Sequence, residues 1–294
     1  MRKQLADTVG DAIKADDKVV LLFGDVGTYG FRHAAAQFPS RVYNVGILEQ
    51  SMVSMAAGLS MQGFIPVVHT IAAFLVERSF EQIKDDFGYQ GLGGNFISIG
   101  ASYDMASWGC THQCPADIGI LKNIPEIEVV VPGTASEFDS LFKESYDNGH
   151  PTYFRLSFNN NIGNLKVNFG KANVIKKGKK ATVVAVGPML DRVKEACKDM
   201  DVTVLYYTTL QPFDYKSLKK NISGDKLIVC EPYYSGAFAV DISQAMSGRK
   251  IAISYIGVPR EFPHHYGTTG DIDKSFHLAL NEIKIRIAKI INSK

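Results

Sequence analysis

The sequence predicts an α/β protein with two domains, each built on a mostly parallel sheet flanked by helices. Short apolar runs of strand length alternate with longer helical patterns along the whole chain. A polar stretch rich in Asn, Gly and Lys, residues 159–179, interrupts this alternation and is expected to be a linker. The length of 294 residues also favours two domains, since one domain usually contains about 100–200 residues.

Residues 1–158 are expected to form the first domain. Its predicted strands are short apolar runs that end in Gly or polar residues, as buried strands do where they enter loops. These strands are 18–23, 42–45, 65–70, 95–100, 128–132 and 152–155. The predicted helices are 4–14, 49–62, 79–87 and 135–146. This alternation indicates a parallel sheet with right-handed connections.

Residues 180–294 are expected to form the second domain by the same logic. Its predicted strands are 181–186, 202–206, 226–230 and 250–253, and its predicted helices are 189–199, 236–247 and 273–293. Ligands of open parallel sheets bind beyond the carboxyl ends of the strands. A site is therefore expected among the first-domain loops 24–33, 46–50, 69–78 and 100–114.

Composition narrows the classes of function. The net charge is only +2, which argues against a broad nucleic-acid surface. No apolar run approaches the roughly 20 residues that span a membrane, and the N-terminus does not read as a signal peptide.

Cys110 and Cys114 flank His112, but a structural zinc site needs four ligands and a second pair is missing. We expect reduced thiols and a cytoplasmic protein.

The segment from Gly46 to Met52 places one carboxylate, Glu49, at the start of an apolar helix rich in small residues. Ionised Glu is rarely buried without a partner. Glu49 therefore either points into water or is held in an apolar place for a chemical reason, and the pattern alone leaves both readings open. Desolvated carboxylates cluster at functional sites.

Two further residues lie in the loops that follow strands. Phe74 is either an ordinary core residue or a flat platform for a planar heterocycle. His112, between Thr111 and Gln113 in a long loop, either lies at the surface or transfers a proton. The segment Gly24-Asp25-Val26-Gly27 lacks the glycine spacing of both common phosphate-binding loops.

Taken together, these segments resemble the transketolase family of thiamine diphosphate enzymes. More narrowly, the chain resembles the C-terminal half of a transketolase encoded as a separate subunit, with residues 1–158 as the pyrimidine-binding domain and 180–294 as the C-terminal domain. The order and spacing of several motifs carry the resemblance: Gly24-Asp25-Val26-Gly27, Gly46-Ile47-Leu48-Glu49-Gln50-Ser51-Met52, the Phe74 segment, Thr111-His112-Gln113, Ala185-Val186-Gly187-Pro188-Met189 and Leu210-Gln211-Pro212-Phe213-Asp214.

The resemblance implies transfer of a two-carbon ketol unit from a ketose to an aldose with thiamine diphosphate. It implies that Glu49 bonds to ring nitrogen N1′ of the cofactor's aminopyrimidine and that Phe74 packs on this ring. His112 would face the substrate and aid proton transfer, and Asp25 would line the same pocket.

The family holds the cofactor's diphosphate through Mg²⁺ and a Gly-Asp-Gly motif with a downstream Asn. In this chain two Gly-Asp pairs are followed by Val and Ile in place of Gly, in Gly24-Asp25-Val26 and Gly270-Asp271-Ile272. Neither segment matches the Gly-Asp-Gly motif. The resemblance therefore implies that this chain has no metal site of its own. An N-terminal transketolase subunit would supply the diphosphate and Mg²⁺ half of the site in an α2β2 assembly.

Three departures from the family pattern concern the substrate. Gly100 and Ala101 stand where the family has a His, Trp108 replaces an acidic residue, and Phe158 falls where a phosphate-binding Arg is expected. Arg155 lies nearby and is a candidate replacement. These changes predict a reshaped pocket, lined in part by Trp108, for which ordinary pentose phosphates are not the expected substrates.

Two alternative functions stay open at this stage. The β subunit of a 2-oxo acid dehydrogenase or decarboxylase shares the two-domain plan and the Glu, although Thr111-His112-Gln113 favours a transketolase. A non-catalytic scaffolding chain with a decayed pocket is the other alternative. Glu49 and His112 argue against such decay, whereas Gly100 and Trp108 are compatible with it.

Overall fold

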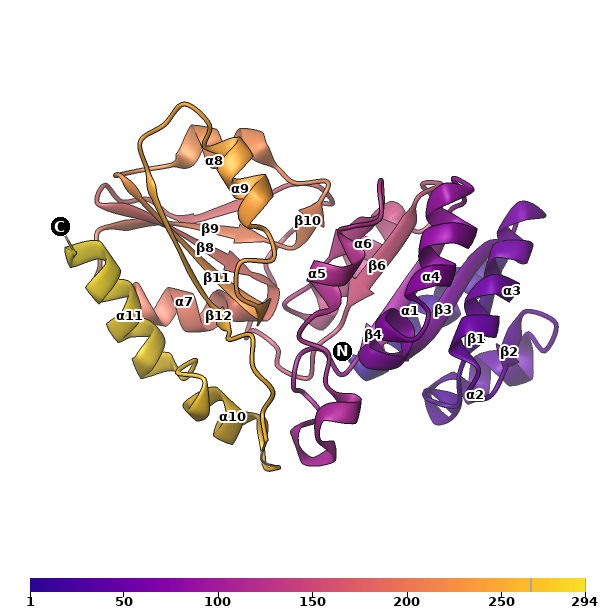
Figure 1. Ribbon diagram of the computed structural model, residues 1–294. Coiled ribbons are helices and arrows are strands. Elements are labelled where there is room, and N and C mark those ends of the chain that lie inside the picture. Colours follow the sequence, from indigo (N-terminus) through magenta and orange to yellow (C-terminus); the bar gives the residue numbers. More distant parts are fainter. Residues whose placement is uncertain (265, 294) are drawn as a thin grey trace.

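The computed structural model describes residues 1–264 and 266–293 and shows two α/β domains side by side (Figure 1). The first domain contains a seven-stranded sheet in the order β10-β5-β6-β4-β3-β1-β2, and the second a five-stranded sheet in the order β12-β11-β8-β9-β7. Neighbouring strands run parallel except at one edge of each sheet, where β10 and β7 are antiparallel to β5 and β9. The predicted fold class is confirmed.

The strands and helices have the following bounds. The first sheet contains β1 (Val19–Phe23), β2 (Val42–Asn44), β3 (Ile65–Ile71), β4 (Gly94–Ile99), β5 (Glu128–Val130), β6 (Pro151–Arg155) and β10 (Thr209–Gln211). Around it lie α1 (Arg2–Ala15), α2 (Thr28–Gln37), α3 (Glu49–Met61), α4 (Phe80–Gln82), α5 (Asp117–Leu121) and α6 (Ala135–Ser145). The second sheet contains β7 (Asn173–Lys176), β8 (Ala181–Val186), β9 (Val202–Tyr207), β11 (Lys226–Tyr234) and β12 (Ala252–Val258), with α7 (Leu190–Ala196), α8 (Tyr215–Asn221), α9 (Ala239–Ala245), α10 (Thr269–Ser275) and α11 (Leu280–Asn292).

Each sheet is the middle of three layers because alternate strand residues point to opposite faces. In β1, Val19 and Leu21 belong to the core cluster that also contains the buried apolar residues of α1 and α6. Their neighbours Val20 and Leu22 pack in the cluster that contains the buried apolar residues of α3 and α5. All five residues of β1 are buried, which explains why the strand reads as a continuous apolar run.

The two domains are joined by more than the covalent linker. β10 comes from the second half of the chain but pairs with β5 of the first sheet. Lys122, just after α5, forms an ion pair with Asp241 of α9. Figure 1 shows α5 and β10 lying where the two domains meet. The second half of the chain is therefore in direct contact with the first sheet and with the end of α5.

Most predicted strands and helices are present, but the structure corrects several segments. The predicted single helix 273–293 is wrong, because the chain turns at His277, whose φ is 54°, and α10 and α11 are separate helices. The predicted loop 24–33 contains the start of α2, which the sequence pattern missed because Phe31 is its one buried residue. Part of the expected linker forms β7, which pairs with β9.

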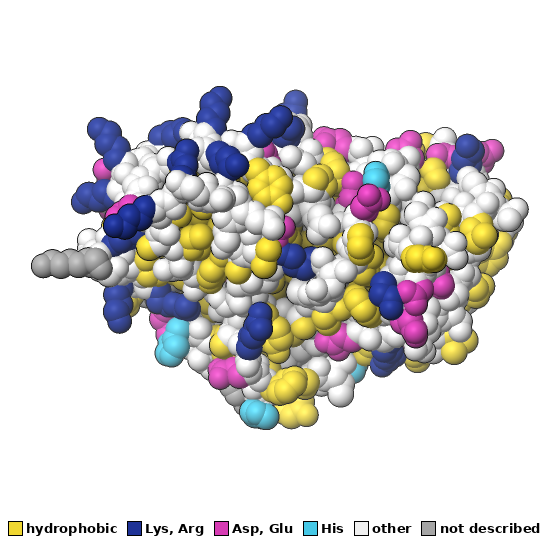
Figure 2. Space-filling view, turned by 45° about the horizontal axis from the view of Figure 1, so that its top comes forward, with side chains coloured by type: hydrophobic (Ala, Val, Ile, Leu, Met, Phe, Trp, Pro, Cys, Tyr) yellow, Lys and Arg dark blue, Asp and Glu magenta, His cyan; other side chains and the backbone are white. Residues whose placement is uncertain are grey.

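The surface mixes charged and apolar side chains. Figure 2 shows Lys and Arg side chains gathered along one rim over the second domain, interspersed with other groups. Over the whole chain, 32 Lys and Arg residues are nearly balanced by 30 Asp and Glu residues, which leaves a net charge of +2. Among the described residues no helix is long and apolar enough to cross a bilayer.

Candidate functional site

Glu49 is the first residue of α3, and its side chain is only 4% exposed. One carboxylate oxygen, Oε2, lies 3.1 Å from Nη1 of Arg78. The other, Oε1, is buried and has no hydrogen-bond partner among the described residues. A buried acceptor without a partner costs about 1–3 kcal/mol. Of the two readings of Glu49, the structure supports the interior one, and it leaves an acceptor that a ligand's N–H could satisfy.

Glycines allow two loops to approach this carboxylate closely. A Cβ on Gly24, at the end of β1, would lie 2.9 Å from the carbonyl oxygen of Gly46 and 3.9 Å from Glu49 Oε1. Gly46 itself has φ 74°, a region that L side chains rarely adopt. The missing side chain of Gly24 therefore lets the two loops approach each other and leaves the space beside the unpaired oxygen unfilled.

Asp25 lies in the same loop but is exposed, with φ 57°. Asn44 at the end of β2 donates to Asp25 Oδ1 at 3.0 Å. The Asn44 Oδ1 atom accepts from the backbone N–H of Asp25 at 3.1 Å and from that of Gly46 at 3.0 Å. Asp25 and Asn44 thus join the Gly24–Gly27 loop to the segment that leads into Glu49.

Phe74 is half-buried on a π-helical turn, Ala73–Glu77, which follows β3. Short π-helical turns are rare and occur frequently at functional sites. The guanidinium carbon of Arg78 lies 3.8 Å from the centre of the Phe74 ring, so Arg78 links this ring to Glu49. Arg78 was not predicted from the sequence, although a buried carboxylate needs a cation nearby, which could have indicated such a partner.

His112 joins the same group of side chains. It ends a short 3₁₀ turn, Cys110–His112, and its ring centre is 5.2 Å from that of Phe74 at an interplanar angle of 66°. The ring centre of Trp108 lies 4.9 Å from that of His112, and Trp108 is 64% exposed. Three loops therefore bring Glu49, Phe74 and His112 together, with Trp108 at the outer rim.

Arg155, the candidate substrate-binding arginine, lies in the interior. It is 1% exposed, and its Nε donates to Asp117 Oδ2 at 2.7 Å. Its Nη2 donates to Ser102 Oγ at 3.0 Å and to the carbonyl oxygen of Pro232 at 3.3 Å. Protein groups therefore occupy the guanidinium in this structure, and substrate binding by Arg155 stays a prediction.

A cavity of about 590 Å³ is lined by Gly27, the last residue of the Gly24–Gly27 loop, and by residues of α1 and α2. Its lining includes the basic residues Arg2, Lys3, Arg32 and His33, one carboxylate, Asp7, and the buried His69. His69 donates from Nδ1 to the carbonyl oxygen of Ile97 at 2.8 Å, and burial lowers the pKa of its imidazole to about 4. This cavity was missed because its basic residues are dispersed in the sequence.

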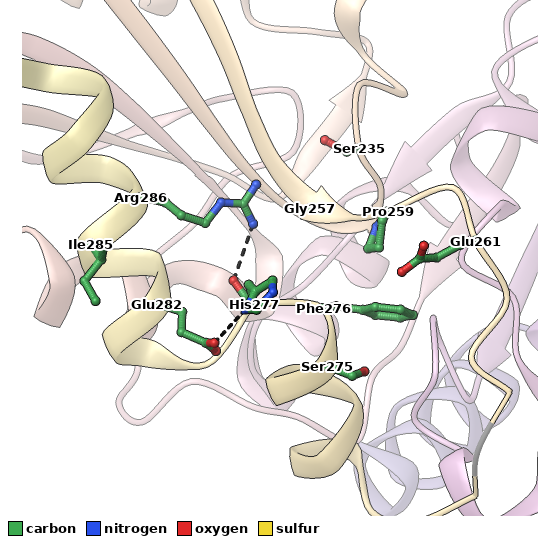
Figure 3. A pocket seen from close by; sticks show the side chains of 10 residues that line it. All are labelled: Ser235, Gly257, Pro259, Glu261, Ser275, Phe276, His277, Glu282, Ile285 and Arg286. Atoms are coloured by element: carbon green, nitrogen blue, oxygen red, sulfur yellow. Dashed lines mark hydrogen bonds and ion pairs between the residues drawn. The ribbon is translucent and has the colours of Figure 1, made fainter. Parts of the chain in front are cut away.

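A second cavity, of about 640 Å³, lies in the second domain (Figure 3). Arg286 and His277 point into it, but His277 pairs with Glu282 at 2.8 Å and Arg286 bonds to the His277 carbonyl oxygen at 3.4 Å. No group of three or more His, Cys, Asp or Glu side chains suited to a metal ion occurs within residues 1–264 and 266–293. The group around Glu49, with its unpaired buried oxygen, is therefore the candidate functional site.

Comparison with protein families identifies both halves of the chain. Residues 1–161 match the transketolase pyrimidine-binding domain, and residues 170–283 match the transketolase C-terminal domain. An uncharacterised 33.6 kDa protein in the fasciation locus of Rhodococcoides fascians is 39% identical over 270 residues, which is 90% of this chain and 86% of that protein.

Relatives with a named activity are more distant. The 6-deoxy-6-sulfo-D-fructose transketolase subunit SqwH of Clostridium sp. (strain MSTE9) is 26% identical, over 75% of this chain and 72% of its own. An apulose-4-phosphate transketolase subunit of Actinobacillus succinogenes is 29% identical, over 66% of this chain and 65% of its own.

Solved structures agree with this relationship. A structure described as a split gene transketolase, inactive beta4 tetramer, superposes with a TM-score of 0.87 at 25% identity, covering 99% of this chain and 97% of that chain. The Campylobacter jejuni transketolase, at 17% identity, shares the fold with a TM-score of 0.79, covering 98% of this chain and 46% of that one.

Proposed function

We propose that this chain, which belongs to the transketolase family, carries the pyrimidine-binding half of a thiamine diphosphate site and acts in ketol transfer with a partner subunit. The buried, unpaired Oε1 atom of Glu49 is the observation that carries this proposal. An aminopyrimidine presents the planar ring and polar edge that Phe74 and this oxygen together suit.

The residues present fit the pyrimidine end of the cofactor. Glu49 Oε1 would accept a hydrogen bond from the ring nitrogen N1′, Phe74 would pack on the ring, and Gly24 leaves room beside the carboxylate. When bound, thiamine diphosphate supplies a nucleophilic carbon and an electron sink for cleaving the bond beside a ketose carbonyl.

The protein's own side chains would hold and transfer protons and would position the loops of the site. Glu49 would hold a proton at N1′, and its burial would exclude the water that competes for it. His112, in ring contact with Phe74, is placed to exchange a proton with a substrate oxygen. Asp25 acts indirectly, through the loop that it holds with Asn44.

The second half of the site is assigned to a partner. The described residues offer no metal-binding cluster, and the Gly24-Asp25-Val26 loop departs from the family's Mg²⁺-binding motif. Two relatives are named as subunits, and the split-gene structure is described as an inactive beta4 tetramer. An N-terminal transketolase subunit holding the diphosphate and Mg²⁺, in an α2β2 complex, explains these observations together.

The substrate is proposed to be a sugar with an anionic group. The cavity beside the Gly24–Gly27 loop has four basic residues and one carboxylate in its lining, and it shares that loop with the Glu49 site. The named relatives act, by their names, on a sulfonated sugar and a sugar phosphate. The exposed Trp108 indole at the rim distinguishes this pocket from that of enzymes with an acidic residue there.

Calorimetry tests the division of the site. Thiamine diphosphate with Mg²⁺ is titrated into this chain alone, into the complex with its N-terminal partner, and into a complex carrying Glu49→Ala. We expect binding only in the wild-type complex. Tight Mg²⁺-dependent binding by the chain alone would contradict the role of the partner, and equal binding by the variant would contradict the role of Glu49.

Hydroxypyruvate distinguishes the proposed reaction from its alternative. Release of carbon dioxide with transfer of the ketol unit to an aldose supports a transketolase. Activity confined to branched or simple 2-oxo acids supports the 2-oxo acid dehydrogenase reading instead. A complex that binds its partner but turns over neither substrate class would favour a scaffolding role.

A further inference from the structure

Arg155 joins three segments that are far apart in the sequence. It is the last residue of β6, and its planar guanidinium bonds to Asp117 at the start of α5 and to Ser102 after β4. The third partner is the carbonyl oxygen of Pro232, within β11 of the second domain. A fixed fork of donors suits such a junction better than the single ammonium of Lys.

Two of these partners bracket the segment that carries His112. We name residues 102–114 the rim loop, since Trp108 and His112 lie within it. Ser102 and Cys114 close its base by an antiparallel bridge, in which the Cys114 N–H donates to the Ser102 carbonyl oxygen at 2.7 Å. Asp117 follows three residues after Cys114. One side chain, Arg155, therefore holds the rim loop at its entry and just beyond its exit.

The junction is built into the interior. Asp117 is fully buried and also accepts from Tyr153 Oη at 2.9 Å. The backbone N–H of Tyr234 donates to the Pro115 carbonyl oxygen at 2.9 Å, which adds a second tie from β11 to the end of the rim loop. Little freedom remains at the base of the loop, while its outer part, with Trp108 64% exposed, faces solvent.

The base of the rim loop is also coupled to the turn that carries Phe74. The Cys114 thiol donates to Glu77 Oε1 at 3.5 Å, and Glu77 is the last residue of the π-helical turn. The ring contact between Phe74 and His112 thus spans two segments whose relative position is set at Cys114.

We propose that Arg155 is a positioning residue, which fixes the distance between His112 and Phe74 by clamping both ends of the rim loop against the second domain. This inference rests on the proposed function only for its catalytic consequence. Its structural content, that Arg155 determines where His112 lies, holds whatever the substrate is.

Trp108 provides a readout that does not depend on activity. It is the single tryptophan of the chain, and its ring lies 4.9 Å from that of His112. A protonated imidazole in contact quenches indole emission, so lowering the pH should quench Trp108 in the wild-type chain and not in His112→Ala. In Arg155→Lys, which keeps the positive charge beside Asp117, we expect most of this pH-dependent quenching to be lost.

Kinetics of the assembled complex give the second readout. Arg155→Lys should lower kcat about 10- to 100-fold, since small misplacements of a catalytic group have effects of this size. The affinity for thiamine diphosphate should stay unchanged, because Arg155 makes no contact with Glu49 or Phe74. Loss of cofactor affinity in parallel with kcat would instead indicate general damage to the fold and overturn the proposal.

Two further variants guard against misfolding and non-specific effects. Arg155→Leu combined with Asp117→Asn removes both buried charges at once, so no uncompensated charge remains, and it should lose the quenching as Arg155→Lys does. Lys122→Gln removes another ion pair between the domains without touching the rim loop, and it should keep both quenching and kcat.

The outcomes separate the inference from the proposed function. Wild-type quenching in both Arg155 variants would overturn the positioning role. A wild-type complex that neither binds thiamine diphosphate nor turns over ketoses would overturn the proposed function, while the fluorescence comparison would still decide the role of Arg155.

Discussion

The Arg78 guanidinium lies 3.1 Å from one oxygen of Glu49, while the other oxygen of the same buried carboxylate has no partner among the described residues. The two oxygens therefore have different surroundings. Arg78 compensates the charge from the solvent side, and the unpaired oxygen faces the space beside Gly24.

Glu49→Gln should abolish most turnover while leaving assembly intact. The amide cannot exchange a proton with a ring nitrogen, and removal of a proton-transfer group typically costs about 10²–10⁴-fold in rate. Steady-state kinetics of the complex, with its size checked by gel filtration, measure this effect. Glu81→Gln, a change on the nearby α4, is the control and should retain activity. A Glu49→Gln complex within a few-fold of wild type would show that the carboxylate is not catalytic.

The contact between Arg78 and Glu49 should appear as a coupling energy. We expect about 0.5–1.5 kcal/mol from a double-mutant cycle of Arg78→Met and Glu49→Gln, because Arg78 is 46% exposed and water screens part of the interaction. Urea unfolding of the four proteins gives the free energies of unfolding. Additive effects of the two substitutions would mean that the pair contributes nothing in solution.

Phe74→Leu should weaken binding of thiamine diphosphate to the complex by about 3- to 10-fold, which corresponds to the loss of one aromatic ring contact. Phe74→Tyr keeps the flat face and should bind nearly as wild type. Calorimetry compares the three proteins. If the leucine variant binds as tightly as wild type, the ring does not pack on the cofactor.

Glu231→Gln should make the protein more stable at alkaline pH. Glu231 in β11 is fully buried, and burial raises the pKa of its carboxyl from 4.5 to about 8, although the bond from the Gly236 N–H and the charge of Lys122 oppose this rise. Between these two pH values the unfolded chain has lost the proton that the folded chain keeps. The wild type therefore loses about 1.4 kcal/mol of stability per pH unit from this group as the pH rises from 4.5 to 8.

Urea unfolding from about pH 5 to about pH 8.5 measures the difference between the two proteins. The stability advantage of Glu231→Gln should be small at the acidic end, grow with pH and level off above the folded-state pKa of about 8. Parallel curves for wild type and variant over this range would show that Glu231 does not titrate in this window.

The buried strands of the fold could be predicted from the sequence, whereas one helix could not. Continuous apolar runs such as Val19–Phe23 identified buried parallel strands, because strands covered on both faces carry no alternation. Helix α2 was missed because it buries only Phe31, so its residues show no apolar face.

At the site, the sequence brought forward Glu49, Phe74 and His112, which the structure places together, but it could not assign the arginines. Arg78 and Arg155 are the same residue type, so the sequence does not tell their roles apart. The structure shows that Arg78 lies over Phe74. Arg155 is instead buried and bonded to Asp117 and Ser102. The ion pair of Arg78 with Glu49 spans 29 positions of the sequence. The bonds of Arg155 to Asp117 and Ser102 span 38 and 53 positions, so no local pattern encodes these three contacts.

Strand β10 has a consequence for any attempt to divide this protein. It follows the linker in sequence yet covers the outer edge of β5 in the first sheet. A fragment that stops within the linker would leave the backbone N–H and C=O groups of β5 without their neighbour, and open strand edges recruit strands from other molecules. The isolated first half would therefore be prone to aggregate, so the first domain depends on the rest of the chain for its solubility as well as for its geometry.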